Sequence, residues 1–200
     1  MNKCLIVVDF QNDFIDGALG FDGALDIKDE IIKKIDQYKS NRFDVMYTYD
    51  THKDDYLDTE EGQNLPVIHC VEGSFGHQIQ KDVFDKMEDH DKTFVKYAFP
   101  SLELGNFIKD KAYDVVELCG LVSNICVLSN AVIVKSALPN AHVVVDNNAT
   151  KSFDEFLKDE VVETPQEISR IQQEEHINQP IDFTTVTQAP QEEITQVPLV

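Results

Sequence analysis

Short apolar runs rich in β-branched and aromatic residues alternate along the chain with segments in which apolar residues recur at helical spacing. This alternation is typical of a parallel sheet that is flanked by helices. Five strands are predicted, at residues 3–9, 44–49, 93–96, 114–118 and 142–145.

The helical pattern is clearest in three segments between the predicted strands. The first has apolar residues at Ile27, Ile31, Ile32, Ile35 and Tyr38, and the second has them at Leu102, Leu104, Phe107 and Ile108. The third runs over residues 124–138 and stops at Pro139. Together with the strands, these segments predict a three-layer, Rossmann-like α/β fold with helices on both faces of the sheet.

The composition changes from about residue 161, where Gln, Glu, Thr and Pro become frequent. Residues 166–175 could form a helix and residues 181–186 a sixth strand, which would complete a mainly parallel sheet of about six strands. We therefore predict one domain over residues 1–187, whose part after about residue 151 is the hardest to place, and a disordered acidic tail over residues 188–200.

The charge of the chain restricts its partners. Asp and Glu number 37 against 17 Lys and Arg, which gives a formal net charge of -20. Such a surface repels nucleic acid and anionic membranes, so neither is an expected partner. The apolar stretch at residues 4–8 is too short for a signal sequence or a spanning helix, and we expect a cytoplasmic protein.

The four cysteines contain no CxxC pair, so neither a disulfide framework nor a cysteine zinc site is indicated. Cys4 and Cys119 lie in apolar runs and are predicted to be small buried residues, whereas the role of Cys70 stays open. Cys126 differs because it follows the glycine that ends an apolar run, at the predicted first turn of a helix. Backbone N–H groups there would lower the pKa of the thiol and could bind an oxyanion.

Charged residues end several of the predicted strands. Asp9, Asp50 and Lys96 follow apolar runs, and parallel strands bring their carboxyl ends to the edge where ligands gather. A carboxylate, an ammonium group and the Cys126 thiol would together form a nucleophilic triad. The alternatives are a turn residue at Asp9 and a solvated surface charge at Lys96.

Histidines and acids gather in the long connection over residues 50–75. Asp50 and His52, with His69 further along, are a suitable ligand set for a catalytic divalent ion. Zinc is the favoured ion, with iron and manganese as alternatives, and Glu61 is a candidate fourth ligand. The alternative is a loop turn with surface histidines. His77 and His90 lack this context and are predicted to be surface residues.

Several of these residues form an ordered set that resembles the cysteine hydrolases of the isochorismatase-like superfamily, particularly nicotinamidases. The set comprises Asp9-Phe10-Gln11-Asn12-Asp13-Phe14, Asp50-x-His52, His69-Cys70-Val71-x-Gly73, Lys96, and Gly120 followed six residues later by Cys126. The resemblance implies that Cys126 is the nucleophile, Asp9 the general base and then acid, and Lys96 their cationic partner. It also implies a cis peptide bond between Leu121 and Val122, with the Val122 and Cys126 N–H groups forming the oxyanion hole.

The same resemblance implies that Asp50, His52 and His69 bind the metal and that Phe14 stacks on the substrate ring, although Phe14 could equally be a core residue. The implied activity converts nicotinamide to nicotinic acid and ammonia through a thioester on Cys126. Alternatives are hydrolysis of another small amide or an enol ether, and a catalytically silent binding module. The chain has no tryptophan, whereas many nicotinamidases have Trp-Pro where this sequence has Leu65-Pro66. A homo-oligomer is compatible with the resemblance.

Overall fold

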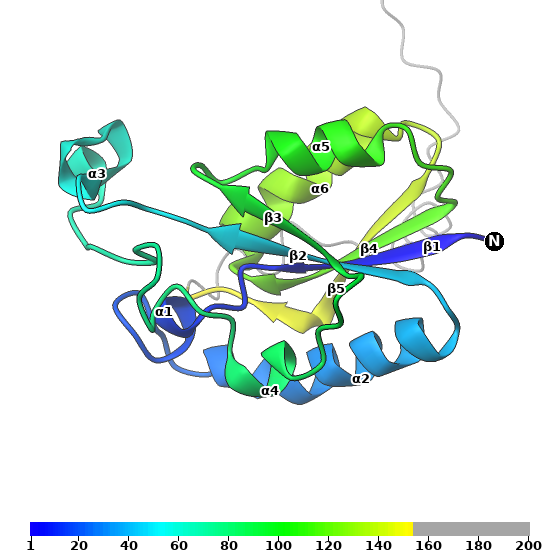
Figure 1. The fold of residues 1–200 in the computed structure, drawn as a ribbon, viewed down its shortest axis with the longest axis horizontal. Helices are drawn as coiled ribbons and strands as arrows, with labels where there is room; N and C mark the ends of the chain where they lie inside the picture. Colours follow the sequence, from blue (N-terminus) through cyan, green and yellow to red (C-terminus); the bar gives the residue numbers. More distant parts are fainter. Residues whose placement is uncertain (154–200) are drawn as a thin grey trace, which may run out of the picture. The chain divides into compact units, whose positions relative to one another are not determined.

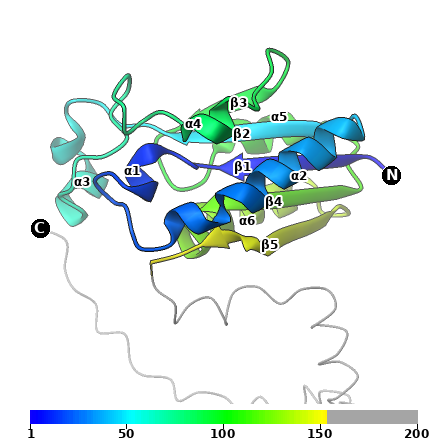
Figure 2. The same cartoon turned by 90° about the horizontal axis from the view of Figure 1, so that it is seen from below.

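The computed structural model describes residues 1–153, and its centre is a parallel sheet of five strands in the order β3-β2-β1-β4-β5 (Figures 1 and 2). The strands are β1 (Lys3–Val8), β2 (Asp44–Asp50), β3 (Lys92–Lys96), β4 (Val115–Leu121) and β5 (His142–Lys151). The predicted α/β fold is thereby confirmed. The helix predicted at residues 166–175, the sixth strand at 181–186 and the tail at 188–200 lie outside the described residues.

Helices cover both faces of this sheet (Figure 1). Helices α2 (Lys28–Ser40) and α4 (Lys81–Phe84) lie on one face, and α5 (Leu102–Ile108) and α6 (Leu128–Ala137) lie on the other. Shorter elements are α1 (Asn12–Ile15), α3 (Glu60–Asn64), the 3₁₀ turns Ala24–Ile27 and Tyr56–Asp58, and a π-helical turn at Ser123–Val127. None of the helices in residues 1–153 has the length and apolar character needed to cross a membrane.

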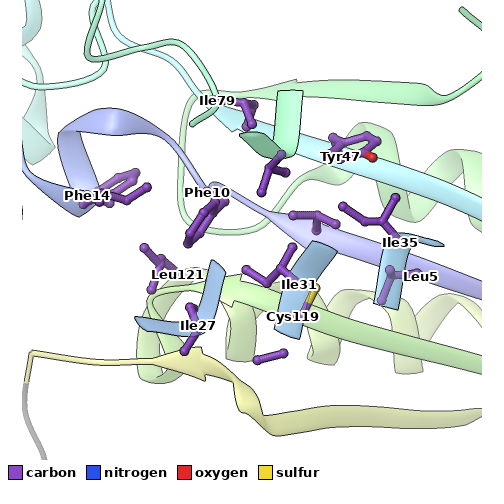
Figure 3. Packing of buried hydrophobic residues seen from close by; sticks show 14 of the residues in the cluster. Leu5, Phe10, Phe14, Ile27, Ile31, Ile35, Tyr47, Ile79, Cys119 and Leu121 are labelled. Atoms are coloured by element: carbon purple, nitrogen blue, oxygen red, sulfur yellow. The ribbon is translucent and has the colours of Figure 1, made fainter. Parts of the chain in front are cut away.

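The central strand β1 is buried on both faces, which explains its continuous apolar run. Leu5 packs into the core on the α2 side with Ile31 and Ile35 (Figure 3). Cys4, whose side chain points to the opposite face, packs into the second core under α5 and α6. All four cysteines are buried and free, so the predictions for Cys4 and Cys119 are confirmed.

Strand β5 is longer than predicted. It continues past Val145 through a register shift, so that Val145 lies opposite Leu118 and Thr150 lies opposite Gly120. The polar residues between the two paired segments of β5 obscured this continuation in the sequence. As a result, Thr150 donates a hydrogen bond to the carbonyl of Gly120 (2.8 Å) and supports the end of β4.

Candidate active site

Lys96, the last residue of β3, connects the predicted site residues. Its buried Nζ lies 2.7 Å from Asp9 Oδ2, 2.9 Å from Asp50 Oδ1 and 3.6 Å from Cys126 Sγ. Asp9 follows β1, Asp50 ends β2, and Cys126 follows β4 in the π-helical turn. The structure therefore brings the predicted triad together at the carboxyl edge of the sheet, and the alternative of a solvated Lys96 is wrong.

Thr48 orients the Asp9 carboxylate. Its Oγ1 donates to Asp9 Oδ1 (2.6 Å) and accepts a hydrogen bond from the Asp9 backbone N–H (3.2 Å). Asp9 has a positive φ of 44°, so the chain turns at this residue directly after β1. The sequence analysis missed Thr48, although a hydroxyl within the buried apolar run of β2 was the available signal.

The burial of this cluster determines the direction of the pKa shifts. Burial raises the pKa of the Asp9 carboxyl, and the Asp50 charge adds to this effect while the Lys96 ammonium opposes it. Burial also raises the pKa of the Cys126 thiol well above its ordinary value, again against Lys96. A protonated thiol thus lies in the same buried cluster as a carboxyl group with increased proton affinity, a combination suited to proton transfer.

The surroundings of Cys126 differ in two respects from the expectation. The residue lies within the π-helical turn Ser123–Val127, and α6 begins only at Leu128. Its thiol pKa is raised rather than lowered, because burial outweighs the favourable charge of Lys96. The cis peptide bond between Leu121 and Val122 is present, as the resemblance implies.

Gly120 permits the close packing of β4 against β1 before this turn. It has a φ of 113°, and a Cβ atom there would lie 2.0 Å from the carbonyl oxygen of Val8. Asn130 then holds the turn from α6, since its Nδ2 donates to the carbonyl of Cys126 (2.8 Å). The cysteine is therefore fixed from both sides of the turn.

The predicted metal ligands also lie together. Asp50 Oδ2 is 3.1 Å from His52 Nε2 and 3.4 Å from His69 Nε2, and the three ligating atoms all lie within 4.8 Å of one another. His69 Nδ1 is 2.7 Å from the carbonyl of Val67, a contact that favours the tautomer with Nε2 free to bind an ion. Glu61, the candidate fourth ligand, lies at the margin of this ligand set, with Oε1 3.9 Å from His52 Nε2.

Two imidazole nitrogens and one carboxylate oxygen fit zinc, iron or manganese. Although burial would raise the pKa of Asp50, hydrogen bonds from His52 and His69, together with Lys96, hold it well below its usual range.

Two further histidines, His77 and His90, are predicted to be surface residues. The prediction is wrong for His77, which is half-buried with Nε2 2.8 Å from Thr51 Oγ1. It is confirmed for the exposed His90.

A cavity of about 350 Å³ opens beside Cys126 and Val122. Its walls are mainly aromatic and aliphatic, contributed by Phe14, Leu19, Phe21, Leu65, Phe99 and Phe153. Phe14 is buried, and its ring meets the His69 ring edge-on at 5.8 Å between centroids. Within residues 1–153, no Lys or Arg lines this cavity, which has the size and apolar character of a small-molecule site.

Two of three comparisons with known proteins gave matches, and both agree with the site geometry. The sequence matches the Isochorismatase domain model over residues 3–167. Curated protein sequences gave no match.

Solved structures share the fold. The nicotinamidase of Bacillus subtilis has 24% identity and a TM-score of 0.70, and the match covers 86% of this chain and 94% of that one. The N-carbamoylsarcosine amidase of Thermoplasma acidophilum has 26% identity and a TM-score of 0.67, with 80% and 90% covered. A zinc complex of the pyrazinamidase of Pyrococcus horikoshii has 20% identity and a TM-score of 0.66, with 86% and 96% covered. The chain therefore belongs to the isochorismatase family of hydrolases, as its ordered motifs predict.

Proposed function

We propose that this chain is a metal-dependent amidase that hydrolyses nicotinamide to nicotinic acid and ammonia through a thioester on Cys126. The observation that carries the proposal is the position of Lys96, whose Nζ contacts both the Asp9 carboxylate and the Cys126 sulfur next to an apolar cavity. An acid–base group and a nucleophile that share one buried cation form the minimal machinery for acyl transfer.

The proton moves first in this mechanism. The Asp9 carboxylate takes the proton of the Cys126 thiol, and its increased proton affinity favours this transfer. The Lys96 ammonium stabilises the thiolate as it forms. The thiolate then attacks the carboxamide carbon, and the backbone N–H groups of Val122 and Cys126 donate to the oxyanion.

The leaving group departs with the same proton. Asp9, now neutral, protonates the amide nitrogen, so that ammonia leaves and the acyl group stays on Cys126 as a thioester. Asp9 then removes a proton from water, which attacks the thioester carbon; the carbon–sulfur bond breaks, the acid is released, and the Cys126 thiolate takes the proton back from Asp9. One carboxylate thus serves as base and acid in turn, and Thr48 holds it in one orientation throughout.

Asp50, His52 and His69 would hold the divalent ion, which when bound supplies a Lewis acid for a pyridine ring nitrogen. Zinc is the ion we favour, because the donor set suits it and the structurally similar pyrazinamidase is a zinc complex. The buried Phe14 ring would then form one wall for the aromatic substrate. Such an activity would serve NAD metabolism by pyridine nucleotide salvage.

Similarity to an N-carbamoylsarcosine amidase favours a second candidate, hydrolysis of another small amide. The charge of the cavity discriminates between substrates. A carboxylate-bearing amide would find no Lys or Arg among the described lining residues, and it would meet Glu61 and Asp50. A neutral aromatic amide carries no such penalty, because it buries its ring against apolar walls.

The test is ammonia release from nicotinamide by zinc-loaded protein, measured beside a chelated sample and Cys126→Ala. Cys119→Ala is the matched control, because it removes a buried thiol from the sheet core and not from the cavity. We expect release by the wild type and by Cys119→Ala, and none by the other two. Absence of release from folded, zinc-loaded wild type would contradict nicotinamidase activity and favour other amides or a silent binding role.

A further inference from the structure

We propose that Gln11 is a positioning residue that pre-forms the metal-ligand set, with Asp13 assisting it. This inference rests on the proposed metal site at Asp50, His52 and His69. Gln11 belongs to the short segment between β1 and α1 that also carries the proposed base, Asp9, and Asp13 lies in α1. Their side chains make no contact with the cavity, so their contribution passes through the residues that they hold.

The fully buried Gln11 amide is bonded to both backbone groups of Asp50. Its Oε1 accepts from the Asp50 N–H (2.8 Å), and its Nε2 donates to the Asp50 carbonyl (2.9 Å) and to the His77 carbonyl (2.8 Å). If β1 continued alongside β2 to this point, the N–H and the carbonyl of Asp50 would bond to the backbone of β1. β1 ends at Val8, so the Gln11 side chain replaces the missing strand at Asp50.

The opposite side of this strand end is held by β3. Asp50 lies opposite Lys96 in the parallel register, and the Thr51 N–H donates to the Lys96 carbonyl (2.9 Å). The Asp50 backbone is thus fixed between a true strand and a glutamine side chain. Because the carboxylate of Asp50 faces both histidines and Lys96, a shift of this backbone would disturb all three contacts.

Asp13 extends the same support to the histidines. Its Oδ2 accepts from the N–H of Cys70, the residue after His69 (2.7 Å). Cys70 has a positive φ of 45°, and its carbonyl accepts from the His52 N–H (2.9 Å). The backbone N–H of Glu72 then donates to the His52 carbonyl (2.8 Å). The backbones of all three proposed ligands are therefore tied to residues 11–13.

This tethering accounts for the short distances within the ligand set. Three polar side chains are buried with their ligating atoms within 4.8 Å of one another. When an ion binds such a pre-formed site, no free energy is lost in ordering the ligand side chains. The affinity for the ion therefore depends on the residues that hold these side chains in place. Loss of a comparable outer partner costs about 10- to 100-fold in metal affinity.

The experiment compares Gln11→Met with Gln80→Met in the full chain. Both exchanges keep the length of the side chain and remove its hydrogen bonds to backbone groups. Gln80 Oε1 accepts from Asp82 N (2.8 Å) and Val83 N (3.3 Å) at the start of α4, outside the ligand set. Zinc affinity is measured by competition with a chromophoric chelator, and ligand geometry by the visible spectrum of cobalt-loaded protein.

We expect Gln11→Met to bind zinc about tenfold or more weakly, with an altered cobalt spectrum, while Gln80→Met keeps wild-type affinity and spectrum. If Gln11→Met does not fold, Gln11→Glu replaces it, because its second oxygen would face the Asp50 and His77 carbonyls instead of donating to them. Unchanged zinc affinity and spectrum in the folded Gln11 variant would overturn the inference alone. Absence of zinc binding by the wild type would overturn the proposed metal site as well.

Discussion

Two lysines of this molecule each lie between two carboxylates, in very different surroundings. Lys96 contacts Asp9 and Asp50 at the carboxyl edge of the sheet. Lys34, on α2, pairs with Glu117 of β4 (2.8 Å) and with Asp146 of β5. Both clusters therefore contain one cation and two acidic groups.

The difference lies in access to water. In the Lys34 cluster, each of the two carboxylate side chains keeps 18% of its surface exposed, whereas the Asp9 side chain has 0%. Partial burial acts against ionisation of Asp146, yet the hydrogen bond from Lys34 lowers its pKa below the ordinary value. The pKa of Asp9 is instead raised, because burial outweighs the attraction of the shared lysine.

This comparison shows how one arrangement of charges can serve two purposes. Where water reaches the cluster, the pKa of Asp146 stays below its ordinary value and its ion pair with Lys34 adds to stability. Where the cluster is fully buried, one cation does not compensate two carboxylates, and one of them becomes a good proton acceptor. A neighbouring thiol and an adjacent cavity then make this acceptor useful.

The largest expected effect separates the two lysines by activity. Lys96→Met removes the cation that stabilises the Cys126 thiolate and leaves Asp9 and Asp50 as buried like charges. We expect amidase turnover to fall by about a thousandfold, within the range typical of acid–base machinery. Steady-state ammonia release would measure this, and activity within tenfold of wild type would contradict a role for Lys96 beyond structure.

The second expected effect is a loss of stability at Lys34, with activity retained. Lys34→Met leaves Glu117 and Asp146 half-buried without their cation, and we expect the free energy of unfolding to fall by about 2 kcal/mol, between the values for exposed and buried pairs. Amidase activity should stay within about twofold, since such changes act far from the reacting groups. Urea unfolding measures the loss. Lys33→Met is the matched control, because its partner Glu30 lies one turn away on the same helix surface.

The sequence predicted the Lys96 cluster and missed the Lys34 cluster for a physical reason. Parallel strands place their carboxyl ends at one edge of the sheet, so the sequence alone predicts that charged residues following apolar runs lie close together. Lys34 meets its partners only through the packing angle of α2 on the sheet and the continuation of β5 past Val145. Neither is encoded in a local pattern.

Local sequence patterns also fail to predict some contacts within the candidate active site. The sequence alone predicts Asp9, Lys96 and Cys126 as site residues. The contact of Thr48 with Asp9 depends instead on the exact pairing of β1 with β2. The π-helical turn at Cys126 was predicted as an ordinary helix start, because one inserted residue does not alter the apolar spacing enough to be seen. Local patterns thus gave the residues, and long-range packing decided their environments.

A third, smaller effect sharpens the comparison through thiol reactivity. Cys119 lies near the Lys34 cluster and is fully buried, whereas Cys126 lines the cavity. We expect iodoacetamide at neutral pH to alkylate Cys126 about tenfold or more faster than Cys119 or Cys70, because the reagent can enter the cavity that Cys126 lines and Asp9 lies in the same cluster to take the thiol proton, whereas the other two thiols are fully buried in the core. Peptide mass spectrometry measures the rates. Faster reaction of Cys70 would contradict the assignment of the nucleophile.

The smallest expected effect tests the charge of Asp146 directly. A carboxyl whose pKa is lowered on folding stabilises the protein above its unfolded pKa, and this contribution disappears as the pH falls through the folded value. Asp146→Asn should therefore cost about 1 kcal/mol of unfolding free energy at pH 7, and the difference from wild type should shrink below about pH 4. Urea unfolding of both proteins at pH 7 and pH 3 measures it. Because the other carboxyl groups titrate in both proteins, their contributions cancel, and a difference as large at pH 3 as at pH 7 would assign the effect to hydrogen bonding by Asp146 and not to its charge.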